Sequence, residues 1–416
     1  MLIRVFKAFS PSSIGSIGRQ LSTKSNPSKP EIVIVSALRT PIGSFRGSLS
    51  QLSGPQLASQ AIKAIIDETK IKPGQVDEVI LGNVVGAGAG QAPTRQAVIN
   101  AGLPPKTITT TINKVCASGM KSIMFSASSL ALYHTNIMIA GGMESMSNVP
   151  FYLRRGDANY NHAQLIDGII HDGLWDSFHQ IHMGNCGENT AKKLGITRED
   201  QDKYAIASYE RAAAAAKSGL FDKERISVAI PDRKTGTKTI SDDEEYHKVD
   251  FGKLASLKSV FQKDGTITAA NASKLNDGAA ACLLMRSNTA TELGLKPLAK
   301  IVDYADNEIE PIDFPIAPVE AMRKLLDRNG LKAHNVSMWE INEAFSVVPL
   351  ANIKLLGLDP NKVNMHGGAV SLGHPIGMSG ARIVHHLAHN LKSGEFGIAS
   401  ICNGGGGASA ILIQGN

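Results

Sequence analysis

The chain has 416 residues, of which 43% are hydrophobic and 19% are charged. This length exceeds that of one ordinary domain, so we expect roughly two or three domains with sizeable buried cores. Every apolar stretch is broken by glycine or charge well short of the roughly 20 residues that a membrane-spanning helix needs. The composition therefore argues against a membrane-spanning protein.

The formal net charge of +6 invites a nucleic-acid-binding interpretation, but its distribution argues against one. Residues 1–29 hold five basic residues and no acidic residue, so the remainder of the chain is nearly neutral. Serine and apolar side chains are interleaved with these basic residues, which is typical of a cleavable mitochondrial transit peptide rather than a disordered basic tail. We therefore expect a protein of the mitochondrial matrix with no nucleic-acid partner.

The spacing of cysteine and histidine argues against a metal centre. The four cysteines lie far apart without a C-x-x-C pair, so the sequence predicts neither a zinc site nor a dense disulfide framework: Cys116, Cys186, Cys282 and Cys402. A second group fits no common ligand pattern: His171, His179, His182 and Cys186. At least two thiols are therefore free for chemistry.

Strands and helices alternate along the first half of the chain. The expected order is a strand over 31–36, a helix over 57–66, a strand over 76–81, a helix over 120–132 and a strand over 137–140. The turn-prone T-P-I-G-S at 40–44 follows the first strand. This alternation is typical of an α/β fold.

The second half repeats this order. It predicts a strand over 298–302, a helix over 317–326, a strand over 338–341, a helix over 380–391 and a strand over 397–402 that leads to the glycine run 404–407. Two copies of one α/β unit are therefore predicted, the alternative being two α/β domains whose similarity is accidental. Between the halves, residues 144–263 are polar and loop-rich around one helix at 198–217, which indicates an inserted lid or binding module.

Cys116 lies in N-K-V-C-A-S-G-M-K-S, at the expected start of the helix 120–132. A helix N-terminus stabilises negative charge, so a thiolate there is favoured and becomes a better nucleophile. The small residues that follow leave room for a substrate. The alternative is a buried structural cysteine, which is the commoner role of a free thiol.

His374 stands among five glycines in G-G-A-V-S-L-G-H-P-I-G-M-S-G-A-R, just ahead of the helix 380–391. Such glycine density indicates tight turns or close contact with a ligand. An imidazole presented there could accept the thiol proton of Cys116 as a general base. A structural histidine is the alternative.

Cys402 ends the last predicted strand and opens C-N-G-G-G-G, whose backbone amides can point at an anion. A thiol at that place could act as the acid or base opposite the nucleophile. A phosphate cradle is the alternative, but no G-x-G-x-x-G follows the first strand, so no redox cofactor is expected. Asn342 in N-E-A-F could orient a water or donate to an oxyanion, or be a solvated loop residue.

These four motifs, in this order, resemble the thiolase family, and the similarity spans essentially the whole chain after residue 29. The resemblance implies an α/β thiolase fold, in which two repeated αβα halves form a five-layered sandwich with a loop domain inserted over the active site. It places an N-terminal domain at 30–290, the inserted loop domain at about 145–265 and a C-terminal domain at 291–416. It also implies a homotetramer that acts on acyl-CoA substrates.

Three further segments resemble the mitochondrial short-chain branch of the family: Q-I-H-M-G from Gln180, T-A-A-N-A-S at 268–273 and I-D-F-P-I-A-P from Ile312. That branch cleaves acetoacetyl-CoA or condenses two acetyl-CoA in ketone-body, isoleucine and fatty-acid metabolism. Phe314 and Pro315 match residues that shape a pocket for a 2-methyl branch, so 2-methylacetoacetyl-CoA is a further expected substrate. The alternatives are a long-chain 3-ketoacyl-CoA thiolase and a non-catalytic thiolase-like acyl-CoA or lipid carrier.

The resemblance also implies catalytic roles. Cys116 would carry the acyl group, His374 would activate it, and Cys402 would give a proton to the departing carbanion or CoA sulfur, or take one from the attacking carbon. Asn342, through a water, would join His374 in one oxyanion hole, and the backbone amides of Cys116 and Gly404 would form the other.

For the remaining sites the resemblance implies two residue sets. The CoA and substrate contacts would come from Tyr209, Lys248, Val249, Asp250, Lys253, Ser273, His182, Met183, Phe314 and Phe345. A potassium ion would be held by Tyr209, Ala269, Ala270, Ala272 and Val370, several of which offer only carbonyl oxygens. One departure stands at 364–368, where the family's common Asn-x-Asn-Gly-Gly is replaced by Asn-Met-His-Gly-Gly, so that His366 alters the hydrogen bonding expected beside the catalytic loop.

Overall fold

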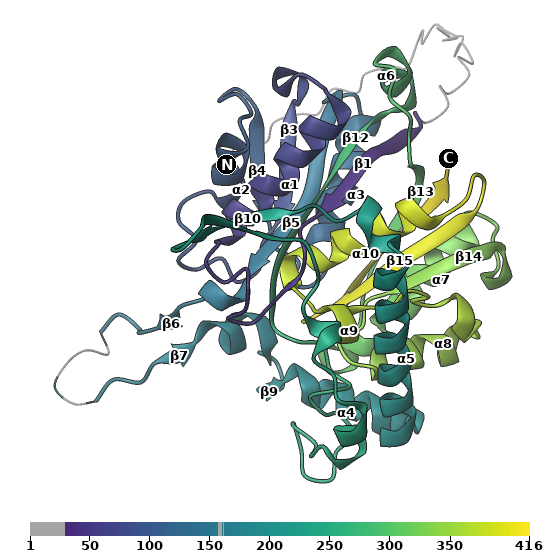
Figure 1. The fold of residues 1–416 in the computed structure, drawn as a ribbon. Coiled ribbons are helices and arrows are strands. Elements are labelled where there is room, and N and C mark those ends of the chain that lie inside the picture. The colour runs from purple at the N-terminus through teal and green to yellow at the C-terminus, as the bar shows by residue number, and fades with distance from the viewer. Residues whose placement is uncertain (1–29, 157–159, 161) are drawn as a thin grey trace, which may run out of the picture. The chain divides into compact units, whose positions relative to one another are not determined.

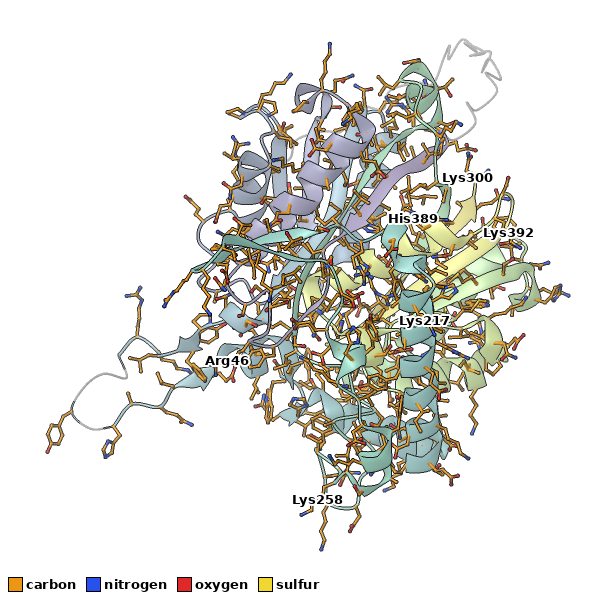
Figure 2. All side chains as sticks on the ribbon, in the orientation of Figure 1. Arg46, Lys217, Lys258, Lys300, His389 and Lys392 are labelled. Carbon is orange, nitrogen blue, oxygen red and sulfur yellow. The ribbon has the colours of Figure 1, made fainter. Side chains whose placement is uncertain are left out.

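The computed structural model describes residues 30–156, 160 and 162–416, so the predicted transit peptide at 1–29 lies outside the described residues (Figure 1). Within the described residues, no helix is long and apolar enough to cross a membrane. Charged side chains such as those of Lys217 and Lys258 extend into solvent (Figure 2).

The first half contributes six strands to one sheet, and the central ones are apolar and buried. β1 (Ile32–Arg39), β5 (Ile137–Ser145) and β12 (Asn276–Arg286) are buried along their whole length. With β3 (Glu78–Gly82) and β4 (Ile108–Ile112) they stand in the order β4-β3-β5-β12-β1. The short β2 (Gly43–Ser44) pairs with β12. The helices of this half are α1 (Gly54–Thr69), α2 (Pro93–Asn100), α3 (Ser118–Ala131) and α6 (Ser287–Glu292).

The second half repeats the four central strands of the first in the same order. β14 (Val336–Ile341) and β15 (Phe396–Asn403) are parallel, as β3 and β5 are, and β16 (Gly407–Gly415) and β13 (Ala299–Glu308) follow antiparallel, as β12 and β1 do. The counterpart of β4 is reduced to one parallel bridge between Trp339 and Val363. The helices are α7 (Ala317–Arg328), α8 (Val347–Leu356), α9 (Ala369–Leu372) and α10 (Ile376–Asn390). This order supports the predicted repeat.

β1 and β13 pair antiparallel and join the two halves into one sheet of ten strands. α3 and α10 contact each other and strands of both halves, whereas α1 and α2 contact strands of the first half and α7 strands of the second (Figure 1). The strands of each half form one layer, with α3 and α10 between the two. The layers are therefore helix, sheet, helix, sheet, helix, and the predicted fold class is confirmed. Glycine makes the middle contact possible: a Cβ on Gly142 of β5 would lie 1.9 Å from the carbonyl oxygen of Gly377.

The inserted segment contains more regular structure than expected. α5 (Arg198–Lys217) has the predicted bounds, but a second helix, α4 (Met183–Leu194), precedes it. Short hairpins complete the segment: β6 (Phe151–Tyr152) with β7 (Ile166–Asp167), β8 (Trp175–Asp176) with β9 (Ile181–His182), and β10 (Val228–Asp232) with β11 (Gly236–Ile240).

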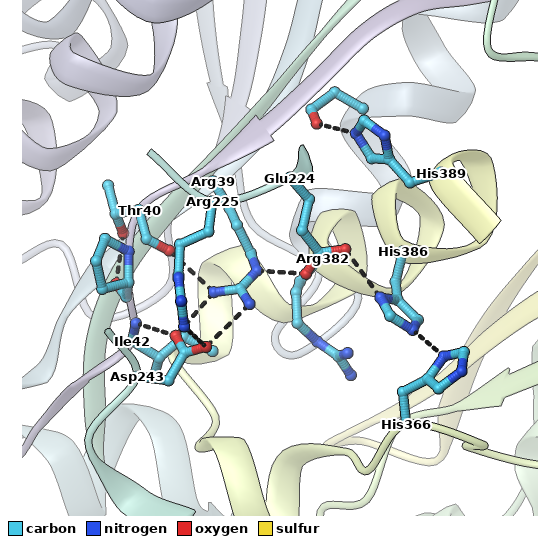
Figure 3. Close-up of polar contacts among 12 residues, drawn as sticks. Arg39, Thr40, Ile42, Glu224, Arg225, Asp243, His366, Arg382, His386 and His389 are labelled. Atoms are coloured by element: carbon cyan, nitrogen blue, oxygen red, sulfur yellow. Dashed lines mark hydrogen bonds and ion pairs between the residues drawn. The ribbon is translucent and has the colours of Figure 1, made fainter. Parts of the chain in front are cut away.

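A buried polar network ties β1 to the insert and to α10 (Figure 3). The Arg39 guanidinium lies 2.7 Å from one oxygen of Glu224 and 2.8 Å from Asp243. The other oxygen of Glu224 lies 2.8 Å from Nδ1 of His386. Although burial acts to raise it, the pKa of Glu224 is held well below its usual range by His386 and Arg39. The network therefore holds β1, the insert and α10 together through the Glu224 carboxylate, which stays charged.

Candidate active site

Cys116 follows β4 and precedes α3, on a tight loop that the next residues hold in shape. The hydroxyl of Ser118 accepts a hydrogen bond from the Lys114 amide at 2.8 Å and donates to the Val115 carbonyl at 2.6 Å. Val115 has φ 46°, a left-handed conformation that is costly for a β-branched residue. The sequence places the sulfur at a helix start, as expected, and strained backbone fixes its direction.

The resting thiol of Cys116 is neutral. Burial raises its pKa to about 12, although hydrogen bonds from the backbone amides of Gly404 and of Cys116 itself lower it. The expectation that the helix N-terminus would favour the thiolate is therefore wrong for the resting site, because loss of hydration outweighs the local amides. A sulfur in this state needs a general base before it can attack a thioester.

His374 lies between α9 and α10 and is held in one tautomer. Its Nδ1 lies 2.6 Å from Oγ of Ser379, whose hydroxyl donates to the carbonyl of Pro375 at 2.9 Å. The proton between His374 and Ser379 therefore belongs to Nδ1, and Nε2 keeps its lone pair. Burial, with a smaller effect of Arg382, lowers the pKa of His374 to about 3. The imidazole is thus neutral, and its Nε2 can accept a hydrogen bond or a proton.

Asn342 and Cys402 complete the group. The amide nitrogen of Asn342 lies 3.5 Å from Nε2 of His374, and its backbone N–H donates to the carbonyl of Ser400 at 2.9 Å, two residues before Cys402. Burial and then the neighbouring sulfur of Cys116 raise the pKa of Cys402 well above its ordinary value. Structure thus brings together Cys116, His374, Cys402, Asn342 and the Gly404 amide, from four segments of both halves.

Three buried side chains that sequence reasoning missed hold these loops. Glu144, at the end of β5, accepts hydrogen bonds from the amides of Val84 and Gly377, both at 3.0 Å. Burial raises its pKa to about 8, and these and two further donors oppose that shift. Asn276 accepts from the amide of His374 at 2.9 Å. The glycine pair before Glu144 was the only signal of a close approach there.

Glu343 is the third of these residues, and it stands inside the motif that singled out Asn342. Its carboxylate accepts from the hydroxyls of Tyr204 and Ser208, each at 2.8 Å, from the side chain of Asn364 at 2.9 Å and from the amide of Val370 at 3.0 Å. It therefore joins α5 to the loop that carries His374.

The predicted CoA residues on the insert lie around Tyr209. Its ring, on α5, packs edge-on against Phe251 with 6.4 Å between centroids. Val249 packs against the core, whereas Lys253 is exposed and pairs with Asp250 at 2.9 Å. A charged rim over an apolar anchor suits a ligand with phosphate and adenine parts.

Two further predicted CoA contacts have their partners outside this group. The ammonium of Lys248 donates to the hydroxyl of Ser44. Ser273 lies beside the N-E-A-F motif, because its amide donates to the carbonyl of Ala344 at 3.1 Å. The predicted CoA residues therefore extend from the surface of the insert toward the catalytic loops.

An aromatic wall of three rings extends from the insert to the N-E-A-F motif. His182 stacks on Phe261 with 4.6 Å between ring centroids, and Phe261 meets Phe345 edge-on at 5.8 Å. Burial lowers the pKa of His182. Phe314 is buried in the same hydrophobic cluster as Met183 and Phe345. These predicted pocket residues therefore do come together.

A cavity of about 470 Å³ lies beside this wall, and its lining includes Val115, Met183, Gly404 and Trp175. It is bounded by the loops of Cys116 and Cys402 and by residues of the insert. Trp175 was not singled out from sequence, because no motif surrounds it. The volume is in the range of small-molecule sites.

Three of the five residues predicted to hold potassium surround an ammonium group instead. Nζ of Lys274 lies 2.8 Å from the Tyr209 hydroxyl, 2.7 Å from the Ala272 carbonyl oxygen and 3.3 Å from that of Val370. The other two, Ala269 and Ala270, precede Ala272 in the same loop. A potassium ion would need the same oxygens, and two cations repel at such range. These residues therefore do not fit a potassium ion.

His366, which departs from the family pattern, is accommodated by a second histidine. Its Nδ1 lies 2.9 Å from Nε2 of His386, and burial together with that neighbour lowers its pKa to about 4. Among the described residues, no group of three or more histidine, cysteine or acidic side chains could hold a metal ion, and all four cysteines are free.

Two protein-family models match the chain: "Thiolase, N-terminal domain" over residues 32–288 and "Thiolase, C-terminal domain" over residues 295–415. The chain belongs to the thiolase family. The predicted family and the predicted enzyme class, an acyltransferase, are therefore confirmed.

Relatives and solved structures that are similar to this thiolase agree with its membership of the family. The mitochondrial acetyl-CoA acetyltransferase of Bos taurus is 59% identical over 391 residues, which cover 94% of this chain and 93% of the relative. That of Xenopus tropicalis is 60% identical over 385 residues, 92% of each chain. The Acat5 thiolase of Ascaris suum in complex with coenzyme A has a TM-score of 0.89 at 47% identity, over 93% of this chain and 100% of that one. The Bacillus anthracis acetyl-CoA acetyltransferase has a TM-score of 0.90 at 39% identity, over 93% and 99%.

The names of the two vertebrate relatives agree with the mitochondrial location predicted for this thiolase.

Proposed function

We propose that this thiolase transfers acetyl groups between coenzyme A and carbon: it cleaves acetoacetyl-CoA with CoA into two acetyl-CoA, and it runs the same reaction backwards, through an acetyl-Cys116 intermediate. The observation that carries the proposal is the group formed by the two sulfurs, the imidazole of His374 and the Gly404 amide. The acyl length follows from similarity to relatives named acetyl-CoA acetyltransferase.

In the first half-reaction, Nε2 of His374 takes the thiol proton as the sulfur of Cys116 attacks the ketone carbon of acetoacetyl-CoA. The amides of Cys116 and Gly404 stabilise the oxyanion that forms on that carbon. As the oxyanion collapses, the carbon–carbon bond breaks and its electrons move to the CoA-bearing fragment. The enolate oxygen is stabilised by protonated His374 and, through a water, by Asn342, and Cys402 protonates the carbon to give acetyl-CoA.

In the second half-reaction, the thiol of a new CoA gives its proton to the Cys402 thiolate and attacks the acetyl group on Cys116. The tetrahedral intermediate expels the Cys116 sulfur, which recovers its proton from His374. The products are a second acetyl-CoA and the enzyme in its starting protonation state. In the synthetic direction, each of these steps runs in reverse, and Cys402 removes the α-proton of acetyl-CoA.

Intact-protein mass spectrometry after incubation with acetyl-CoA tests the nucleophile. We expect a mass gain of one acetyl group, lost when Cys116 is alkylated beforehand and absent in Cys116→Ala. Cys282→Ala, which removes a buried thiol of the sheet, is the matched control and should be acetylated as the wild type is. Acetylation of Cys116→Ala at the wild-type rate would refute the assignment.

Substrate comparison tests the acyl length. Acetoacetyl-CoA should be cleaved and 3-ketopalmitoyl-CoA should not; cleavage of the long chain alone would instead identify a long-chain 3-ketoacyl-CoA thiolase. 2-Methylacetoacetyl-CoA is a second proposed substrate. Phe314 and Pro315, which match residues that shape a pocket for a 2-methyl branch, are buried, and Phe314 shares a hydrophobic cluster with Phe345. Absence of turnover with every one of these substrates would favour the non-catalytic carrier.

We also propose a homotetramer. β4 is an edge strand of the sheet and leaves Ile108 59% exposed. The β6–β7 hairpin projects away from the sheet and carries the exposed side chains of Phe151 and Leu165 (Figure 1). Apolar edges of this kind are suited to pairing with further copies. Native mass spectrometry should give the mass of four chains, and a monomer at micromolar concentration would contradict the proposal.

A further inference from the structure

The ammonium of Lys274 lies where three separate segments meet. Tyr209 comes from α5, Ala272 from the loop before β12 and Val370 from α9, and each offers Lys274 one oxygen at 2.7 to 3.3 Å. An ammonium group has three N–H donors, so one donor is available for each oxygen. The side chain is partly buried, and no solvent is required to complete this set of contacts.

Each of the three segments connects to the candidate catalytic residues. α5 does so through Glu343, which accepts from the hydroxyls of Tyr204 and Ser208. Val370 lies in α9, just before His374, and its amide donates to the Glu343 carboxylate at 3.0 Å. The loop of Ala272 is anchored to the N-E-A-F motif, because the Ser346 amide donates to the carbonyl of Asn271 at 2.8 Å. A positive charge at this junction therefore positions both the general base and the motif that carries Asn342.

We propose that Lys274 is an internal cation that replaces a potassium ion in this thiolase, so that catalysis needs no added potassium. Nζ of Lys274 makes the contacts to Tyr209, Ala272 and Val370 that a free ion would otherwise make. Because it is tethered to the chain, it is present at every salt concentration. Lys274 is a positioning residue, since it reaches the reaction only through the loops that it joins.

The wild-type enzyme gives the first test. The kcat/KM for acetoacetyl-CoA thiolysis and the Tm should be the same in potassium, sodium and choline chloride at equal ionic strength. A potassium-specific rise of about fivefold or more, the lower end of ordinary effector coupling, would overturn the proposal. This kinetic readout rests on the proposed function, whereas Tm does not.

Removing the ammonium gives the second test. In sodium chloride, Lys274→Ala should lose about tenfold in kcat/KM, because the loop of His374 is no longer held. Potassium should restore part of that loss and should raise the Tm of the variant alone. Lys217→Ala, which removes an exposed lysine from the end of α5, should behave as the wild type does. Wild-type activity of Lys274→Ala in sodium chloride would overturn the proposal.

Rubidium, whose anomalous scattering reveals potassium sites, gives a readout independent of activity. Crystals of Lys274→Ala soaked in rubidium chloride should show a peak among the three oxygens, and wild-type crystals should show none there. A peak in the wild type would overturn the proposal even if Lys274→Ala fails to fold. If neither protein cleaves acetoacetyl-CoA, the proposed function fails, while the Tm and rubidium results still decide the role of Lys274.

Discussion

Nδ1 of His374 lies 2.6 Å from the hydroxyl oxygen of Ser379, and that hydroxyl donates its one hydrogen to the carbonyl of Pro375. The imidazole must therefore supply the proton of the 2.6 Å bond, which leaves Nε2 unprotonated and directed to the catalytic group. One serine on the first turn of α10 thus sets the tautomer that a general base requires.

Ser379→Ala should lower kcat about 10- to 100-fold, the loss typical of removing the partner that orients a functional histidine. The imidazole would then be free to place its proton on Nε2. The rate of Cys116 acetylation by acetyl-CoA, followed by quenched-flow mass spectrometry, reports this step directly.

Ser126→Ala is the matched control for that variant. Ser126 is buried on α3, and its hydroxyl has no hydrogen-bond partner among the described residues. The same deletion there should leave kcat unchanged. Equal loss of activity in the two variants would mean that Ser379 acts through packing and not through the tautomer.

Cys402→Ala should separate the two proposed proton transfers. Acetylation of Cys116 by acetyl-CoA should slow but persist, because His374 still takes the Cys116 proton and the CoA thiolate can leave without the proton that Cys402 supplies. Exchange of the α-protons of acetyl-CoA with deuterium oxide should fall by about 10²- to 10⁴-fold, the usual contribution of one acid–base group. Both are read by mass spectrometry. An equal loss of both reactions would contradict the proposal that Cys402 is the group that exchanges the proton on the α-carbon.

Acid should destabilise the folded chain partly through His385. Burial lowers its pKa to about 3, against 6.5 for an ordinary histidine. Between these values the unfolded chain binds a proton that the folded chain does not, so stability falls as pH falls, by about 1.4 kcal/mol per pH unit. In His385→Leu this contribution is absent, so the stability of the variant relative to wild type should rise as pH is lowered from 6.5. Urea unfolding at several pH values measures the difference.

The comparison with wild type matters because other buried groups act in the opposite direction. Burial raises the pKa of Glu144 to about 8 and that of Glu340 to about 7. Each of these folded carboxyls binds a proton before its unfolded counterpart does, so each adds stability as pH falls. Their effects cancel in the difference. His334→Leu, at an exposed position, should follow the wild-type curve, and a His385→Leu curve parallel to wild type would refute the prediction.

Glu224→Gln should destabilise the protein by about 3–5 kcal/mol, because it leaves Arg39 and His386 with a neutral partner in a buried network. Urea unfolding at neutral pH measures this change. Glu199→Gln breaks an exposed pair with Lys203 and should cost less than about 1 kcal/mol. Equal costs would show that the network of Figure 3 contributes no more than surface charge does.

Local patterns predicted the parts of the fold that local forces decide. The apolar run of β1 and the helix α5, which begins at the capping residue Thr197, are of this kind. α4 was missed because Gly184 and Gly187 weaken its helical pattern. Its glycines serve packing: a Cβ on Gly184 would lie 2.2 Å from the ring of Phe261. The sequence of α4 alone cannot show this reason, because Phe261 is distant in the chain.

The candidate site divides in the same way. Motifs identified Cys116, His374, Cys402 and Asn342, and the structure brings them to one place. The protonation state of the thiol could not be predicted, because burial by distant segments outweighs the helix terminus. The role of Lys274 could not be predicted either, since nothing in the residues around it indicates that its ammonium contacts Tyr209 of α5.

The pairing of β1 with β13 has a consequence for how activity is acquired. Either half produced by itself would present a bare strand edge along this line and would be prone to aggregate. One half would also possess the nucleophilic sulfur without the imidazole, and the other the imidazole without that sulfur. The enzyme can therefore turn over substrate only after both repeats have docked. The rate at which activity appears during refolding should then report the rate of this docking.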